Sequence, residues 1–142
     1  MLWNLDRPER HYVKYGEHQL EVLTLDTFNL DGNIIVSGSN DATVRVWDIR
    51  MKTPCIRIFE KIKCGVSTVK FMKDCVHTIA VGGHDSSIKL FDLRAISKVG
   101  KYKDDSNDSV ESVDFSNSGR LLFASYSNSK IKVWDVLTEQ RV

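Results

Sequence analysis

One interval recurs along the chain and restricts its fold more than any other feature. Large aromatic residues stand at Trp3, Trp47, Phe91 and Trp134, and the last three are each followed by an aspartate. Their spacings are 44, 44 and 43 residues. Valines at 22, 66 and 110 begin apolar segments at the same interval. A period slightly above forty is typical of β-propellers, in which each repeat forms a four-stranded blade.

Within one repeat, the residue pattern predicts four short strands and no helix. Residues 22–28 form an apolar segment, and the β-branched run at 34–36 predicts a buried second strand. The cluster Ser-Gly-Ser-Asn-Asp at 37–41 predicts a turn. Residues 43–47 alternate, which predicts a third strand with one face inward, and 54–59 would be the outer strand.

Applied to the whole chain, this pattern predicts an all-β propeller segment of about three blades. The expected parts are 1–15, the end of a preceding blade; 16–59, a complete repeat; 60–103, a degenerate repeat; and 104–142, a repeat with a truncated outer strand. Propellers close with four to eight blades, and an open arc leaves strand edges and apolar end faces uncovered. We therefore expect the chain to be a piece of a longer protein.

The first full repeat contains polar residues that predict a structural network around its tryptophan. The indole of Trp47 has one N–H donor that needs a partner once it is buried. His18, Ser37 and Asp41 stand where they could complete a chain of hydrogen bonds with Trp47 and tie three strands together. The second repeat has Ile62, Val81, Asp85 and Phe91 at these positions, and the third has Ser106, Ala124, Asn128 and Trp134. We expect the first repeat to be the most rigid.

Composition and charge exclude several classes of function. The net charge is +1, so no overall field attracts nucleic acid. No apolar run approaches the roughly 20 residues needed to span a bilayer, and the first residues lack the features of a signal peptide. Three cysteines, at 55, 64 and 75, form no C-x-x-C pair and are interpreted as reduced thiols in a cytosolic protein.

The sequence contains no recognisable catalytic or metal-binding constellation. It has no G-x-S-x-G motif, and Gly82-Gly83 lacks the Lys and Ser/Thr of a phosphate-binding loop. The four histidines, at 11, 18, 77 and 84, do not have zinc-ligand spacing. We predict no enzyme activity, no cofactor and no metal site.

Several longer motifs resemble one family of WD-repeat proteins. FDLRA at 91–95, VESVDFSNSGRLLFASY at 110–126 and VWDVL at 133–137 are similar to consecutive pieces of the β subunit of heterotrimeric G proteins. VSGSNDATVRVWDIR at 36–50 fits the blade before them. The resemblance extends over nearly the whole chain.

This resemblance implies a seven-bladed propeller that binds a γ subunit, the GDP-bound α subunit and downstream effectors, at the inner face of the plasma membrane through lipidated partners. Carried across to this sequence, the α-binding positions are Glu21, Leu23, Gly65, Ser67 and His84. Glu21 and Leu23 have chemistry compatible with the family. Gly65 and His84 stand where the family commonly has acids, and Ser67 where it has an amide, so this surface departs from the usual pattern.

A second binding function on the same scaffold is also compatible with the sequence. Residues 47–50 and 91–94 fit the pattern W-D-x-R, with Phe91 in place of the second tryptophan. The pattern resembles that of WD-repeat substrate receptors of cullin ubiquitin ligases. G-protein β subunits carry it too, so the alternative of an adaptor or scaffold propeller stays open at this stage.

Overall fold

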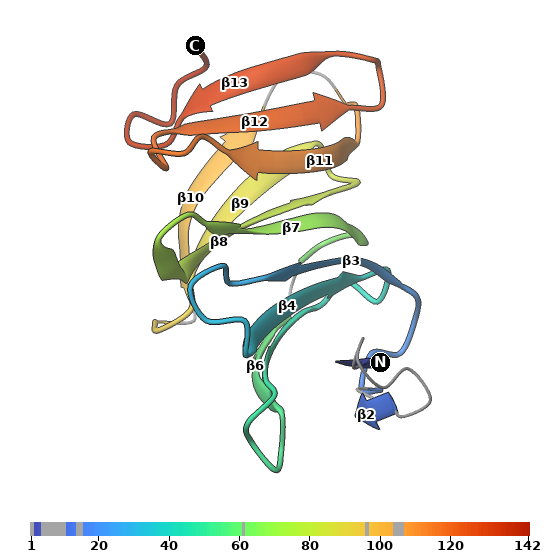
Figure 1. Cartoon of the computed structure of the whole chain (residues 1–142). Coiled ribbons are helices and arrows are strands. Elements are labelled where there is room, and N and C mark those ends of the chain that lie inside the picture. The colour runs from blue at the N-terminus through green and yellow to red at the C-terminus, as the bar shows by residue number, and fades with distance from the viewer. Residues whose placement is uncertain (1, 4–10, 14–15, 61, 96, 104–106) are drawn as a thin grey trace.

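The computed structural model describes residues 2–3, 11–13, 16–60, 62–95, 97–103 and 107–142. In these ranges the chain forms strands joined by turns and no helix, so no helix is available to cross a membrane. Three antiparallel sheets follow one another along the chain and stack face against face (Figure 1). The structure is therefore all-β, as predicted.

Each sheet is a meander in which neighbouring strands pair in chain order. The first sheet contains β3 (Val22–Thr27), β4 (Ile34–Ser39), β5 (Val44–Asp48) and β6 (Cys55–Phe59). The second contains β7 (Val66–Met72), β8 (Cys75–Gly83), β9 (Ser87–Asp92) and β10 (Ser97–Lys103). The third contains β11 (Val110–Phe115), β12 (Leu121–Tyr126) and β13 (Ile131–Asp135). β1 (Leu2–Trp3) and β2 (His11–Val13) form a separate pair, and Arg141 forms a single bridge to Trp134.

Two details differ from the expectations drawn from the sequence. The predicted turn at 37–41 begins later, because β4 stays paired with β3 as far as Ser39. The strand β5 does not have only one face inward, because Val44, Val46 and Trp47 are all buried. Two different neighbours explain this result: Val44 and Val46 pack into the core shared with the second sheet, whereas Trp47 lies on the opposite face, in edge-on contact with the ring of His18.

The inner strands β3, β7 and β11 are joined through hydroxyl groups that repeat from sheet to sheet. Thr24 Oγ1 accepts the backbone N–H of Val69 at 3.3 Å, and Thr68 Oγ1 accepts that of Val113 at 3.2 Å. The second hydrogen bond repeats the first with both partners shifted by one repeat along the chain. The joint between the first and second sheets and the joint between the second and third sheets therefore share this contact.

A glycine on the second strand of each of the first two sheets admits a valine from the next sheet. A Cβ added at Gly82 would lie 2.6 Å from Val110 Cγ1, and one added at Gly38 would overlap Val66 in the same way. Both valines are fully buried. These close contacts fix the distance between neighbouring sheets, which in turn sets the positions of the turns along their edge.

Candidate partner-binding face

The residues predicted to bind a partner lie along one edge of the stack, where the chain enters β3 and β7 and leaves β4 and β8. Glu21 and Leu23 belong to the first sheet, and Gly65 and His84 to the second. Backbone hydrogen bonds hold these segments together: Asn40 N donates to Glu21 O at 2.9 Å, and His84 N donates to Gly65 O at 3.4 Å. The structure thus brings Glu21, Gly65 and His84 to one edge.

Asn40 is a member of this edge that sequence reasoning missed. Its side-chain oxygen covers Gly65 so closely that a Cβ added at Gly65 would overlap it. The same added Cβ would lie 3.2 Å from His84 Cδ2. Asn40 and His84 therefore enclose the space that a side chain at position 65 would need, which accounts for the glycine there. The pairing joins residues 25 positions apart and has no signal in the local sequence.

The five predicted residues differ in whether their side chains are exposed to solvent or hydrogen-bonded within the protein. Glu21, Leu23 and His84 are exposed, and Leu23 lies at a bulge in the pairing of β3 with β4. Ser67 is different, because its hydroxyl donates to the backbone oxygen of Val110 and also lies 3.3 Å from that of Gly82. Ser67 therefore contributes to the joint between the second and third sheets.

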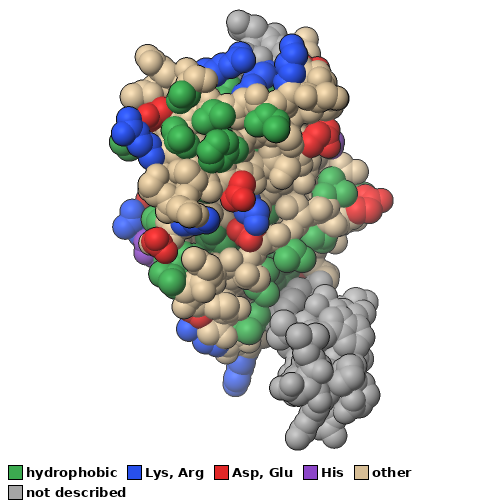
Figure 2. Space-filling model, turned by 45° about the horizontal axis from the view of Figure 1, so that its top comes forward, with side chains coloured by type: hydrophobic (Ala, Val, Ile, Leu, Met, Phe, Trp, Pro, Cys, Tyr) green, Lys and Arg blue, Asp and Glu red, His purple; other side chains and the backbone are tan. Residues whose placement is uncertain are grey.

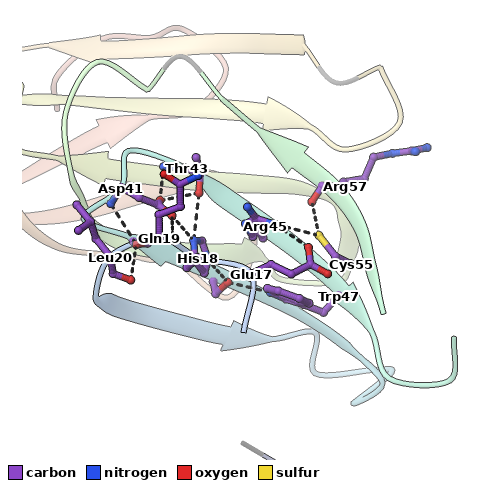
Figure 3. Close-up of polar contacts among 12 residues, drawn as sticks. Glu17, His18, Gln19, Leu20, Asp41, Thr43, Arg45, Trp47, Cys55 and Arg57 are labelled. Atoms are coloured by element: carbon purple, nitrogen blue, oxygen red, sulfur yellow. Dashed lines mark hydrogen bonds and ion pairs between the residues drawn. The ribbon is translucent and has the colours of Figure 1, made fainter. Parts of the chain in front are cut away.

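Behind this edge, His18, Ser37, Asp41 and Trp47 form a continuous hydrogen-bonded network (Figure 3). Trp47 Nε1 donates to Ser37 Oγ at 2.8 Å, and Ser37 Oγ lies 2.8 Å from His18 Nε2. His18 Nδ1 lies 3.0 Å from Asp41 Oδ2. An indole can only donate, so Ser37 Oγ accepts from Trp47; we assign the remaining hydroxyl proton to the contact with Nε2 and the Nδ1–H as donor to Asp41.

The carboxylate of Asp41 accepts several hydrogen bonds in this network. Thr43 Oγ1 donates to Oδ1 at 2.6 Å, and the backbone N–H of Gln19 donates to Oδ2 at 2.9 Å. Burial raises the pKa of Asp41, but the hydrogen bonds from Thr43, Gln19 and His18 outweigh it and hold the pKa well below its ordinary value. Asp41 therefore stays ionised and fixes the turn between β4 and β5.

In the second sheet an ion pair and apolar packing take the place of this network. Asp85 accepts a hydrogen bond from Lys89 Nζ at 2.6 Å and another from Ser87 Oγ at 2.7 Å. Val81 is fully buried, and Phe91 packs against Phe59 of the first sheet with ring centroids 5.2 Å apart. The carboxylate is kept, but the tryptophan, serine and histidine are replaced by apolar groups.

In the third sheet Trp134 lacks the acceptor that Trp47 has. Ala124 stands where the first sheet has Ser37, and both Ala124 and Trp134 are buried. Among the described residues, no hydrogen-bond acceptor reaches Trp134 Nε1. Ser106, the counterpart of His18, lies outside the described residues. Replacement of the serine hydroxyl by the methyl group of Ala124 thus leaves the indole N–H of Trp134 without an acceptor among the described residues.

The two W-D-x-R segments have the same local geometry. Asp48 accepts from Arg50 Nε at 2.9 Å and from Arg50 Nη2 at 2.7 Å, and Asp92 accepts from Arg94 Nε and Nη2 at 3.2 and 2.9 Å. Hydrogen bonds from these guanidinium groups lower the pKa of both carboxyl groups. Arg50 and Arg94 line one groove of about 430 Å³ between the first two sheets, with Val46 and Leu93 also lining it.

No metal centre is formed by the part of the chain that the structure describes, where no three His, Cys, Asp or Glu side chains converge. No disulfide is formed by Cys55, Cys64 or Cys75. Burial raises the pKa of the Cys55 and Cys64 thiols. This edge carries the exposed side chains of Glu21, Leu23 and His84 in front of a hydrogen-bonded support.

Most of the chain matches one known protein family. The family model for the Nucleolar protein 10-like, N-terminal domain, a β-propeller, matches residues 13–142. The chain belongs to this β-propeller family. Its three meander sheets, each following the same period, are the WD-repeat blades of that propeller.

Curated relatives of this propeller are named guanine nucleotide-binding protein subunit beta. The chain is 38% identical to the protein of Oryza sativa subsp. japonica and 36% identical to that of Zea mays, over its whole length. It is 36% identical to the protein of Arabidopsis thaliana over 96% of the chain. The chain spans about two fifths of the length of these relatives, 40% and 38% respectively for the rice and Arabidopsis proteins. The family resemblance inferred from the motifs is thereby confirmed.

Proposed function

We propose that this propeller is a non-catalytic, β-subunit-like component of a heterotrimeric G protein. The observation that carries the proposal is the match to proteins named guanine nucleotide-binding protein subunit beta over 96–100% of the chain. Three blades of a presumed seven would be roughly two fifths of such a ring, in keeping with the 40% coverage of the rice relative. The chain would act by binding an α subunit in its GDP form, a γ subunit and downstream effectors.

The proposed α-binding face is the edge that carries Glu21, Leu23, Gly65 and His84, extended by Asn40. An exposed leucine beside a carboxylate suits a contact with an apolar anchor and a charged rim. Ser67 is included by its position next to Gly65. Its hydroxyl bonds to backbone oxygens, so its contribution would be to hold the edge in place.

The departure from the family's acids gives this face its own charge pattern. Gly65 and His84 supply no carboxylate, so Glu21 is the acid among the five predicted residues. A partner that presents fewer basic residues than usual would fit this face better. Anchoring at the inner face of the plasma membrane through lipidated partners belongs to the same proposal.

A binding experiment with an α subunit tests the proposal. The 142-residue chain, immobilised through an added tag, is exposed to a purified α subunit loaded either with GDP or with a non-hydrolysable GTP analogue. We expect retention of the GDP form and loss of retention with Leu23→Asp. Leu30→Asp is the matched control, because Leu30 is also an exposed leucine and lies in the turn after β3, at the strand's other end. Equal retention of both nucleotide forms would contradict the proposal.

The groove lined by Arg50 and Arg94 supports a second candidate, an adaptor in a cullin ubiquitin ligase. Both guanidinium groups lie on one groove although they come from different sheets, as a shared recognition site requires. Each is held by its own aspartate, so it is fixed in orientation. Co-purification with a cullin ligase that is lost with Arg50→Ala and Arg94→Ala, and unaffected by Leu23→Asp, would favour this candidate.

A further inference from the structure

The turn between β5 and β6 contains the one place in the sequence where a hydroxyl residue is followed by proline. The chain has two prolines, of which Pro54 follows Thr53 and the other follows an arginine. Residues 50–53 are all exposed. The turn projects from the end of the first sheet (Figure 1). The side chain of Thr53 is therefore accessible to a protein in solution.

The hydroxyl of Thr53 has no structural role in the part of the chain that the structure describes. Thr24 and Thr68, on the inner strands, each accept a backbone N–H that joins two sheets. Among the described residues, neither Thr53 nor its neighbour Lys52 makes a hydrogen bond. A group added to the Thr53 oxygen would thus break no existing contact.

The backbone of this turn has the form that a protein kinase binds. The ring of Pro54 disfavours a helical conformation at Thr53 and keeps it extended. Asp48 N donates to Pro54 O at 2.8 Å, which fixes the base of the turn and leaves its tip without hydrogen bonds among the described residues. Kinases bind the phosphorylated segment in an extended form. Those that select a following proline accept a residue without a backbone N–H at that place.

The positive charges beside Thr53 are available to an anion. Arg50 is already paired, with Nη2 2.7 Å from Asp48 Oδ2 and Nη1 3.3 Å from Asp31 Oδ2. Lys52 and Arg57 form no ion pair within the described residues, and Arg57 Nη1 donates to a backbone oxygen at 3.4 Å. In Figure 2, Lys and Arg side chains lie at the lower tip of the coloured surface, the end from which this turn projects.

We propose that Thr53 is a phosphorylation site for a proline-directed serine/threonine kinase, and that Lys52 and Arg57 bind the phosphate. The kinase transfers the γ-phosphoryl group of MgATP. The bond from the γ-phosphorus to its bridging oxygen breaks, a bond to Thr53 Oγ1 forms, and ADP leaves. The hydroxyl proton goes to the catalytic aspartate of the kinase. The product carries a charge of about −1.5 to −2 and three acceptor oxygens.

The phosphate would change the groove between the first two sheets. Arg57 lines this groove together with Arg50 and Arg94. Arg50 and Arg94 are held by aspartates, so Arg57 is the groove arginine that has no carboxylate partner among the described residues. A phosphate on Thr53 supplies that partner and removes the free cation from the groove. The site lies at the opposite edge from Glu21, so it does not rest on the proposed α-binding face.

Phosphorylation in vitro tests the site. The 142-residue chain is incubated with MgATP and a purified proline-directed kinase of the mitogen-activated class, and phosphorylated residues are located by fragment mass spectrometry. We expect phosphate on Thr53, none with Thr53→Ala, and a rate about tenfold lower with Pro54→Ala. Thr27 is the internal control, because it is an exposed threonine in a paired strand and is followed by Phe28.

A peptide of residues 48–58 separates the two ways in which this test can fail. If the peptide is phosphorylated and the chain is not, the turn does not reach the kinase. If neither is phosphorylated, the sequence is not a substrate. Either result overturns the proposal, and so does phosphate on Thr27 at the same rate as on Thr53.

A ³¹P NMR titration of the phosphorylated chain tests the binding of the phosphate. The second pKa of a phosphothreonine is about 6, and nearby cations lower it because they favour the dianion. We expect a pKa below this value in the chain, and a return toward about 6 when Lys52→Gln and Arg57→Gln are combined. Arg120→Gln is the control, because Arg120 is an exposed arginine of the third sheet. An unchanged pKa in the double variant, or an equal rise with Arg120→Gln, overturns the assignment of these cations.

Discussion

Replacing Ser37 with alanine removes the central atom of the network in the first sheet. Ser37 Oγ lies 2.8 Å from Trp47 Nε1 and 2.8 Å from His18 Nε2. The side chains of His18 and Asp41 are only 5% and 6% exposed, so water has little access to the groups left behind. The substitution leaves the indole N–H of Trp47 and the Nε2 of His18 without their hydrogen-bond partner inside the protein.

The cost can be worked out from these two groups. An unsatisfied buried donor or acceptor costs about 1–3 kcal/mol. Two such groups, partly relieved by local rearrangement, predict that Ser37→Ala lowers the free energy of unfolding by about 2–4 kcal/mol. Removal of a single oxygen leaves too little space to add a cavity contribution of similar size.

Urea unfolding monitored by circular dichroism measures the loss, and a double-mutant cycle with Trp47→Phe isolates its cause. Phenylalanine is the residue that the second sheet has at this position, and it has no N–H to strand. Ser37→Ala should therefore cost about 1–2 kcal/mol less in the Trp47→Phe background. The reasoning is refuted if Ser37→Ala costs under about 0.5 kcal/mol, or if its cost is the same in both backgrounds.

Three further changes test other parts of the fold. Ala124→Ser supplies the hydroxyl that Trp134 Nε1 lacks and should raise the free energy of unfolding by about 0.5–1.5 kcal/mol in a urea titration; no gain would contradict the assignment. Gly82→Ala should cost about 1–3 kcal/mol through its clash with Val110, and Val110→Ala should recover part of that cost in the double variant. The folded pKa of Asp41 lies below its ordinary 3.8, so its contribution is present above pH 3.8 and is lost as the pH falls below it. Asp41→Asn should therefore flatten unfolding free energies measured between about pH 5 and pH 2, and an unchanged slope would count against the role of this carboxylate.

Periodicity in the sequence was sufficient to place the sheets and the network. The residues of the network have types with definite hydrogen-bonding capacity. Ser37 pairs with Arg45 and Trp47 with Ile35, so Ser37 and Trp47 are diagonal neighbours on one face of the sheet. Ser37 and Trp47 are separated by a single turn, so their contact follows from local pairing. The same argument correctly assigned apolar residues to the second repeat, where Val81 is buried and Phe91 packs against the core.

Features that depend on the joint between sheets could not be read from the pattern. Alternation along 43–47 predicts that one face of the strand is buried, but it cannot show that Val44 and Val46 are covered by the second sheet in particular. Asn40 occupies the space beside Gly65 only because the joint brings two turns together. The hydrogen bond from Ser67 to Val110 O also depends on the joint, because it is made to a strand that begins 43 residues later.

The different interiors of the first two sheets imply different responses to cooling. The second sheet replaces the polar network with buried Ile62 and Val81 and with the half-buried Phe91. The stabilisation that comes from burial of apolar surface carries a large heat-capacity change and weakens as the temperature falls. The hydrogen-bonded network of the first sheet lacks most of this temperature dependence. We therefore expect the polar network of the first blade to keep its strength on cooling, and the apolar substitute in the second blade to weaken first.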